Sequence, residues 1–514
     1  MEVPDRYAYS SFFPVFGEIF VDRRAKYGIL LRLYAITIYD IKVGHTDMVF
    51  SSLVFMFIYL PAVIAVYYIS PLRWRNLWLF IVNLVFYGWG EPVYILLMLL
   101  SIVINYVSGL IVGANRETNN KRAKTALIVN TVVNLALLMF FKYYDFIAEN
   151  LSLIPGLGFI RPLGITLPIG ISFYTFQTMS YPIDVYRGDT GSQRSYIKFG
   201  TYVALFPQLI AGPIVRYKDV ADQLDQRDTN VDKFAEGIRR FIVGLGKKVL
   251  LANNIGMLWD SFYATPIPEL STAGAWLGII AYTFQIYFDF AGYSDMAIGL
   301  GKMLGFEFLE NFDYPYISKS ITEFWRRWHI SLSSWFRDYV YIPLGGNRKG
   351  LARQFINILT VWALTGIWHG ASWNFLFWGL YYALLLVIEK AFLLKWLEKA
   401  PAALSHIYTM LLVVIGWALF AIDDISLLLD YLGVMFGLGG AGLLSSQVLY
   451  YLRSYGLTLA ILVIACLPLG KQLFAKIPEK AQAVIVPVLI LGVLTLSTAY
   501  LVDSTYNPFL YFRF

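Results

Sequence analysis

The sequence predicts an all-α polytopic membrane protein, and three observations lead to that fold class. Of the 514 residues, 58% are hydrophobic and only 15% are charged, well below the roughly 25% charge of a soluble domain. Apolar stretches long enough to cross a bilayer, about 20 residues each, recur along the whole chain. The aromatic content of 17% suits interfacial belts and tightly packed helices. Composition therefore argues against a soluble domain.

The distribution of charge narrows the class further. The net charge of +7 is modest, and the basic residues cluster between apolar runs. That pattern predicts cytoplasmic loops beside anionic lipid headgroups. No long basic face or recognition motif supports nucleic-acid binding. The single cysteine, Cys466, lies in an apolar run, where we expect a small core residue and no disulfide or thiolate metal site.

The first elements follow an unusual N-terminal segment. Residues 1–47 mix charged and aromatic side chains without the continuous apolar core of a signal peptide, so we expect an accessory or interfacial segment. Four spanning helices are then predicted from apolar runs. The linker Asn115–Lys124 is basic, and we assign it to the cytoplasm. The four predicted spans are 50–70, 76–90, 93–114 and 125–148.

The middle of the chain contains interrupted apolar segments. The run 163–184 is broken by two prolines and a glycine, which is typical of a re-entrant segment or of one that lines a cavity. A second run covers 199–214, and the polar stretch 218–232 is predicted to be a loop. With the later runs the total is about 11 spans. The later spans are predicted at 238–262, 273–304, twice within 355–388, and at 407–422, 427–443, 455–469 and 484–502.

The segment Asn311–Arg353 is rich in arginine and lysine. Aromatic and aliphatic residues recur there at helical spacing, while Arg326 and Arg327 take the other face. This pattern predicts an amphipathic helix at a membrane face, ended by Pro343, with His329 at the margin of its apolar stripe. The excess of basic residues beside apolar spans favours the cytoplasm.

Of the four histidines in the chain, His369 is the one set most deeply in apolar sequence. It lies in the uncharged run Phe355–Ile388, where such a residue usually faces a cavity, a pathway or a partner. Histidine is also suited to accept and return a proton near neutral pH. The alternative is a core histidine that only bonds a neighbouring helix. The run is either two short helices turning at Gly370, with His369 near a membrane surface, or one broken helix with His369 near mid-membrane. Trp368 and Trp373 flank it as possible walls of an apolar slot.

Other polar residues lie where broken helices could face a substrate path. His329 is either an interfacial histidine or part of a helix folded back beneath His369. The two carboxylates near the end of the 273–304 helix form either an interfacial helix end or a polar tunnel wall, and the glutamines offer either substrate contacts or helix packing. No phosphate-binding loop, nucleophile elbow, dinucleotide fingerprint or metal-ligand spacing is present. The tunnel-lining candidates are Asp289, Asp295, Gln177, Gln208, Trp328, Trp368, Asn374, Arg326 and Arg327.

Several separated motifs resemble those of one family, in the same order. They include Pro-Ile-Gly-Ile-Ser-Phe-Tyr-Thr-Phe-Gln at 168–177, Tyr-Phe-Asp-Phe-Ala-Gly-Tyr-Ser-Asp at 287–295, Phe-Trp-Arg-Arg-Trp-His at 324–329 and Gly-Ile-Trp-His-Gly at 366–370. The chain thus resembles the membrane-bound O-acyltransferase (MBOAT) family, in its bacterial alginate O-acetylation branch. The resemblance covers about residues 48–514 and leaves 1–47 as an N-terminal extension.

The resemblance implies both a fold and a function. The fold would be a ring of tilted helices around a thin centre, with a tunnel joining the two membrane faces. His369 matches the signature histidine and His329 the second histidine. No cofactor is bound; the donor would be a cytoplasmic thioester, acetyl-CoA or a carrier-protein thioester. An acyl group would pass across the bacterial cell membrane to an extracytoplasmic SGNH-type partner that acetylates a polysaccharide. Similar proteins transfer D-alanine for teichoic acid modification.

The residues suit that chemistry. Acyl transfer to a hydroxyl requires removal of its proton, and a buried neutral histidine could take it and return it to the departing thiolate. The basic segment could attract donor phosphates or an acidic carrier. Candidates for stabilising the oxyanion are Asn374, Trp373 and Gln177. A transporter or structural subunit without chemistry is the alternative from another class, since broken helices and buried carboxylates would also fit it.

Overall fold

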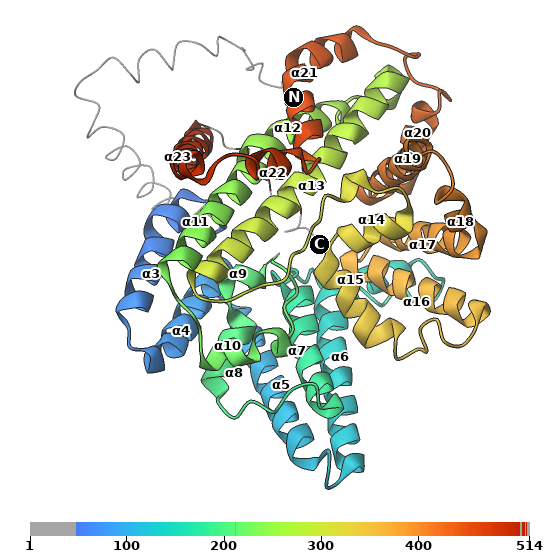
Figure 1. Ribbon diagram of the computed structural model, residues 1–514. Helices are drawn as coiled ribbons and strands as arrows, with labels where there is room; N and C mark the ends of the chain where they lie inside the picture. The colour runs from blue at the N-terminus through green and yellow to red at the C-terminus, as the bar shows by residue number, and fades with distance from the viewer. Residues whose placement is uncertain (1–47, 211, 504–505, 509, 511–514) are drawn as a thin grey trace.

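The all-α prediction is confirmed by the computed structural model, which describes residues 48–210, 212–503, 506–508 and 510. Every regular element in those residues is helical. The predicted extension 1–47 lies outside them. Figure 1 shows two long helices, α11 (Val231–Gly246) and α13 (Thr272–Met303), crossing the molecule side by side. The hairpin of α5 (Ile95–Asn115) and α6 (Asn120–Ser152) projects at the lower end of that view.

The N-terminal helices lie close to the predicted spans. The run 50–70 starts as a π-helical segment, Phe55–Tyr59, and continues as α3 (Leu60–Ile69), followed by α4 (Leu72–Gly90). The helix α6 begins earlier than predicted because the Asn119 side chain accepts a hydrogen bond from the Arg122 N–H and caps its first turn.

The interrupted run 163–184 becomes helical only at α7 (Ile171–Arg187). Gly170 precedes it with φ 73°, and a Cβ there would lie 2.7 Å from the Leu209 carbonyl oxygen, so the position requires glycine. The run 199–214 forms two short helices, α8 (Tyr196–Ala204) and α9 (Phe206–Leu209). These segments are buried in protein along most of their length.

The prediction of a loop over 218–232 was wrong for its first half, which forms α10 (Tyr217–Asp225). Its polar composition hid two buried residues four positions apart, Val220 and Leu224, that face the core on one side of the helix. Asn230 then caps α11, which starts earlier than the predicted 238. The helix continues through the π-helical segment η2 (Lys247–Ala252) into α12 (Asn253–Tyr263).

Small residues let α11 and α13 approach backbone to backbone. A Cβ on Gly292 would lie 2.7 Å from the Gly244 carbonyl oxygen, and one on Gly299 would lie 2.6 Å from that of Gly237. Facing glycines of this kind allow close van der Waals packing between membrane helices. Both faces of α13 are therefore covered by protein, and α13 forms the centre of the core.

The prediction of one continuous amphipathic helix within Asn311–Arg353 was wrong. The chain forms α14 (Ile321–Arg327) and α15 (Ile330–Phe336), because His329 adopts a left-handed conformation with φ 44°. The backbone N–H of Ile330 donates to the Asn311 carbonyl instead of continuing a helix. The aromatic stripe packs inside the protein rather than in a membrane face: Phe324 is 0% and Trp335 4% exposed. A π-helical segment, Arg337–Tyr341, follows.

The run Phe355–Ile388 forms two helices, α16 (Leu351–His369) and α17 (Trp373–Ile388), as in the first of the two alternatives. Gly366 and Gly379 hold them together, since a Cβ on Gly379 would lie 2.4 Å from the Trp362 carbonyl oxygen. The remaining helices are η6 (Glu389–Leu393, π-helical), α18 (Leu394–Leu397), α19 (Ala402–Ala421), α20 (Ile425–Met435), α21 (Ser446–Ala465), α22 (Leu469–Phe474) and α23 (Glu479–Asp503); 3₁₀ turns lie at Ile267–Glu269 and Pro315–Ile317.

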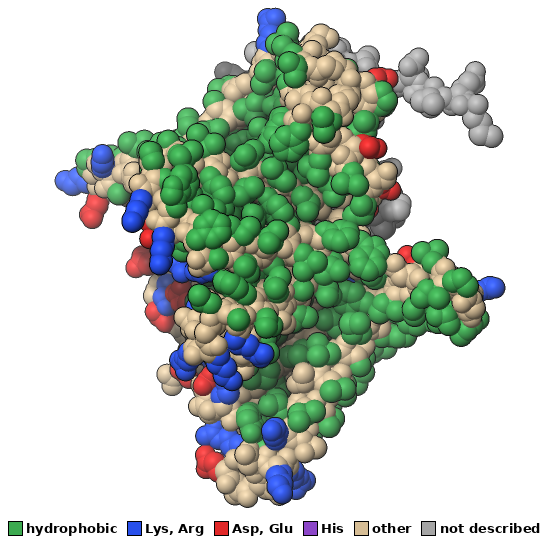
Figure 2. Space-filling view, turned by 90° about the vertical axis from the view of Figure 1, so that its right-hand side faces the viewer, with side chains coloured by type: hydrophobic (Ala, Val, Ile, Leu, Met, Phe, Trp, Pro, Cys, Tyr) green, Lys and Arg blue, Asp and Glu red, His purple; other side chains and the backbone are tan. Residues whose placement is uncertain are grey.

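Seven helical stretches in the described part of the chain are long and apolar enough to cross a membrane, so the protein is multi-pass. Two shorter apolar stretches, Phe55–Ile69 and Ile425–Met435, occupy further predicted positions, and the count of 11 stays a prediction. Figure 2 shows hydrophobic side chains over most of one face, with Lys and Arg along its left-hand edge and lower end. The seven stretches are Ile95–Asn115, Asn120–Ser152, Val231–Tyr263, Trp373–Leu397, Ala402–Ala421, Ser446–Ala465 and Glu479–Asp503.

Candidate active site

His369 ends α16 inside a box of aromatic rings. Its ring meets Trp378 and Phe420 edge-on, with centroids 5.0 and 5.2 Å apart, and lies 5.1 Å from the ring of Trp368. The residue is only 4% exposed, and among the described residues its Nδ1 has no hydrogen-bond partner. A neutral imidazole fits this apolar box because an ion there would lose its hydration.

His329 lies at the break between α14 and α15 and is 2% exposed. Its Nδ1 is 3.0 Å from Asn311 Oδ1, which also accepts hydrogen bonds from the Ser331 N–H and hydroxyl. An amide oxygen only accepts, so this network assigns the proton to Nδ1 and the lone pair to Nε2. Burial lowers the pKa of His329 to about 3, which keeps the ring neutral near pH 7.

Trp368 joins the two histidines. Its indole lies 5.1 Å from the His369 ring and 6.3 Å from the His329 ring, measured between centroids. Phe176 of α7 packs on the same indole and stacks on Trp335 at 3.8 Å. Helices α7, α15 and α16 therefore meet here and bring both histidine rings to one indole, and the shared catalytic role of the two histidines stays a prediction.

Buried polar atoms without partners gather around the histidines. Within the described residues, these include the indole N–H groups of Trp368 and Trp378 and the Oδ1 of Asn374. Buried polar groups are usually hydrogen-bonded, so several buried polar atoms without partners beside two histidines indicate that water or a substrate binds there. Asn374 Nδ2, by contrast, donates to the carbonyls of Leu419 and Phe420.

The remaining aromatic and amide candidates lie at varied distances from this centre. Trp328 is buried against Trp417, 4.8 Å away between centroids. Gln177 is fully buried, and neither atom of its side-chain amide has a partner among the described residues. Gln208 donates to the Tyr202 carbonyl. Trp373 is 46% exposed and donates to Asn150, so it does not wall the box around His369.

The two carboxylates of α13 are held in ion pairs rather than beside the histidines. Asp289 Oδ1 lies 2.8 Å from Lys248 Nζ, and both side chains are 2% exposed. Its Oδ2 accepts from the Leu510 N–H. Asp295 is bound by Arg240 and Lys247 at 2.6 Å. Both carboxylates thus tie α13 to α11 and η2, and Asp289 also ties it to the C-terminal segment.

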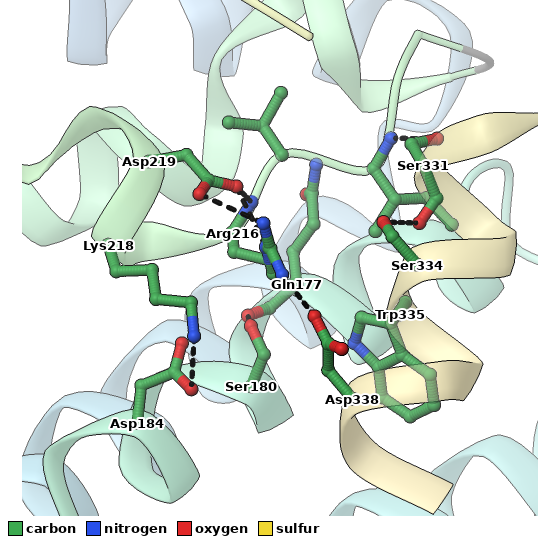
Figure 3. Close-up of polar contacts among 12 residues, drawn as sticks. Gln177, Ser180, Asp184, Arg216, Lys218, Asp219, Ser331, Ser334, Trp335 and Asp338 are labelled. Carbon is green, nitrogen blue, oxygen red and sulfur yellow. Dashed lines mark hydrogen bonds and ion pairs between the residues drawn. The ribbon is translucent and has the colours of Figure 1, made fainter. Parts of the chain in front are cut away.

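A charged cluster lies at the far end of α7, shown in Figure 3. Arg216 binds Asp219 at 2.8 Å and Asp338 at 2.7 Å, and Lys218 binds Asp184 and Asp189. Gln177 and Ser180 extend from α7 beside this cluster, and Trp335 lies beyond Asp338 in the same view. Arg337 also binds Asp338 at 2.7 Å, so four carboxylates face three cations and the cluster has no surplus positive charge for a phosphate.

Unpaired basic charge lies elsewhere on the surface. Arg326 is exposed, whereas Arg327 is bound by Glu323 and Asp313. Arg348, Lys349 and Arg353 are exposed around the turns that follow Tyr341.

Comparison with known proteins identifies the family. Residues 189–429 match the model of the membrane-bound O-acyltransferase family. The probable alginate O-acetylase AlgI of Azotobacter vinelandii is 42% identical over 502 residues, covering 91% of this chain and 100% of that protein. The peptidoglycan O-acetyltransferase of Helicobacter pylori is 34% identical over 77% of this chain and 81% of that protein. The teichoic acid D-alanyltransferase of Bacillus subtilis is 29% identical over 48% of this chain and 65% of that protein.

The chain belongs to the membrane-bound O-acyltransferase family, and it is an O-acyltransferase. This confirms the resemblance found in the separated motifs, and it favours an enzyme over the transporter alternative. The sequence interpretation missed two groups next to the histidines. Asn311 carried no motif of its own, whereas Lys142 was visible as a charge inside the predicted span 125–148.

Proposed function

We propose that the protein moves an acetyl group from a cytoplasmic thioester across the bacterial cell membrane for O-acetylation of an extracytoplasmic polysaccharide. The observation that carries this proposal is the pair of buried histidines on Trp368, near polar atoms that have no hydrogen-bond partner in the described part of the chain. The names of the relatives support the same reaction class, since two of them are O-acetylating enzymes of polymers.

His369 is the proposed base. It takes the proton from an acceptor hydroxyl as the oxygen attacks the thioester carbonyl, and a tetrahedral intermediate forms. Collapse of that intermediate breaks the carbon–sulfur bond, and the proton passes to the departing thiolate. The aromatic box excludes water, which protects the thioester from hydrolysis. Trp368 and Trp378 offer indole N–H groups, and Asn374 stays a candidate at the oxyanion.

His329 is proposed to hold the donor rather than to take the proton. Asn311 Oδ1 accepts the Nδ1–H and so orients the ring, and a neutral imidazole of this tautomer can accept an N–H of the donor at Nε2. The pantetheine arm shared by coenzyme A and acyl carrier proteins supplies such amides. The exposed arginines and lysines from Arg326 to Arg353 would attract the phosphates of that donor or an acidic carrier.

D-alanyl transfer for teichoic acid modification is the second candidate, and the Bacillus subtilis relative is the observation that favours it.

For either acyl group, the acceptor on the outer side is proposed to be an SGNH-type partner that passes the acyl group to the polymer. Labelled substrates separate the two candidates. Inverted membrane vesicles from the producing cells would receive either [¹⁴C]acetyl-CoA or a carrier protein loaded with [¹⁴C]D-alanine.

Transfer of label from acetyl-CoA into luminal polymer, with none from the D-alanyl carrier, is the expected result. If the polymer is labelled only by the D-alanyl carrier, acetyl transfer is contradicted and D-alanyl transfer is supported. No label from either donor would contradict a thioester donor on the cytoplasmic side. A transporter without chemistry would instead tolerate His369→Gln with its transport intact.

The orientation is tested separately by cysteine labelling. Cysteines placed at the exposed positions Arg326 and Arg348, after replacement of Cys466, should react with an impermeant thiol reagent in inverted vesicles only. This follows from the positive-inside distribution of charge. Labelling from the outside of intact cells would show that this segment faces the outside, and the proposed direction of acyl transfer would then be wrong.

A further inference from the structure

Side chains from α6 hold the last turn of the helix that carries His369. The final carbonyls of a helix have no partner within it, and the chain leaves α16 at Gly370 in an extended conformation, φ −170°. Tyr143 Oη donates to the Ile367 carbonyl at 2.6 Å. Lys142 Nζ donates to the carbonyls of Trp368 at 2.5 Å and His369 at 3.3 Å. Two adjacent residues of α6 thus bind three consecutive carbonyls, an arrangement we term the α6 clamp.

The third contact of Lys142 completes its hydrogen bonding. Nζ also donates to Ser172 Oγ of α7 at 3.0 Å, so an ammonium with three N–H donors meets three acceptors. Lys142 is only 9% exposed, deep in the span Asn120–Ser152. A positive charge at the C-terminal end of a helix interacts favourably with the helix dipole. An ionisable residue buried in a membrane span is costly, which makes a functional reason for this one the default expectation.

We propose that Lys142 is a positioning residue for acyl transfer, which fixes the backbone of Trp368 and His369 and thereby aims the His369 imidazole. The inference rests on the proposed role of His369 as base. A shift of this turn would also change the surroundings of His329, because the Trp368 indole is in contact with both histidine rings. Displacement of a catalytic group by about 1 Å can cost 100-fold in rate, so the anchorage of this turn controls the reaction.

The charge of Lys142 adds a second effect that hydrogen bonding alone would not give. In the described part of the chain, the titratable groups whose charge acts on His369 are His329, from the turn before α15, and Lys142, from α6. The helices α17 and α19 contribute Trp378 and Phe420, which carry no charge. Burial is the main cause that lowers the pKa of His369, and the charges of His329 and Lys142 lower it further. Removal of the Lys142 ammonium therefore moves protonation of His369 to higher pH.

Two variants separate the charge from the hydrogen bond. Lys142→Met keeps the length of the side chain but removes the ammonium, whereas Tyr143→Phe removes the neighbouring hydrogen bond without changing charge. Transfer of [¹⁴C]acetyl from acetyl-CoA is measured in inverted vesicles between pH 5 and 8, at equal membrane abundance. We expect kcat to fall by about 10- to 100-fold in Lys142→Met, with KM for acetyl-CoA changed less. The acidic limb of the pH–rate profile should move to higher pH in Lys142→Met. Tyr143→Phe should lower the rate and leave the acidic limb at the same pH.

A readout independent of turnover uses diethyl pyrocarbonate, which modifies a histidine only when its imidazole is neutral. Mass spectrometry of the purified protein in detergent follows modification of His369 against pH, with His406 as the internal reference. In Lys142→Met the reactivity of His369 should be lost at higher pH than in the wild type, while that of His406 stays in place. Identical pH dependence of His369 in both proteins, or loss of the folded protein in Lys142→Met, would overturn the positioning role. An inactive wild type, or an active His369→Ala, would instead refute the proposed function.

Discussion

The rings of His329 and His369 approach one indole, that of Trp368, from separate elements. The centroid distances are 6.3 Å for His329 and 5.1 Å for His369. His369 reaches the indole from the end of α16, and His329 reaches it from the left-handed break before α15. A base and a donor-holding group that both contact one indole are close enough to serve a single reacting carbonyl.

The first prediction concerns the support of His329. His329→Ala should reduce polymer acylation severely but incompletely, because His369 remains as the base. Asn311→Leu removes the acceptor of His329 Nδ1 and of Ser331, so about a tenfold loss of acylation is expected with His329 still present. Polymer acetyl content, corrected for membrane abundance, measures both. Full activity in both variants would show that His329 has no role in acyl transfer.

The second prediction is a pH dependence of stability. The pKa of His329 is lowered to about 3 in the folded protein, against 6.5 for an ordinary histidine. The unfolded chain therefore binds more protons between these values, and stability rises with pH up to about 6.5. Acidification from pH 6.5 to 5 should cost about 2 kcal/mol, at 1.36 kcal/mol for each pH unit.

Thermal melting in detergent at pH 7 and pH 5 measures this effect. The wild type should melt at a lower temperature at pH 5, and His329→Gln should show a smaller difference between the two pH values. An equal difference in both proteins would mean that His329 does not contribute to the pH dependence.

The third prediction concerns the buried pair Lys248–Asp289 and the C-terminal segment. Lys248 Nζ also bonds the Pro508 carbonyl, and the Leu510 N–H bonds Asp289, so the segment completes the pair. Lys248→Met leaves a buried carboxylate without its cation and should destabilise by about 3–5 kcal/mol. The double variant Lys248→Met/Asp289→Leu should recover much of that loss. A double variant as unstable as the single one in thermal melting would contradict this account.

The sequence predicted the fold class and the family because these depend on composition and on local motifs, and the same motifs single out the two histidines, whose catalytic role stays a prediction. It missed contacts between residues far apart in the chain. Lys142 was visible as a charge in an apolar run, but its bond to the Trp368 carbonyl depends on how α6 packs against α16. Asp289 was taken as a candidate tunnel wall, and its partner Lys248 comes from a different helix.

Two errors in the predicted elements have local physical causes. The helix through His329 was predicted from its spacing of aromatic residues, but Asn311 accepts the Ser331 N–H and competes with the helical ladder. The loop at 218–232 was predicted from its polarity, although Val220 and Leu224 face the core from α10. Spacing and polarity describe a helix surface, and they do not include what packs on it.

The central claim is that His369 is the base, and one substitution tests it most directly. His369→Ala should reduce polymer acylation by orders of magnitude, with membrane abundance and melting temperature near those of the wild type. His406→Ala is the matched control, because His406 lies on α19 and, within the described residues, its ring hydrogen-bonds the Ser318 carbonyl. We expect normal acylation in His406→Ala and none above background in His369→Ala. Normal acylation by a well-expressed, stable His369→Ala protein would contradict the account.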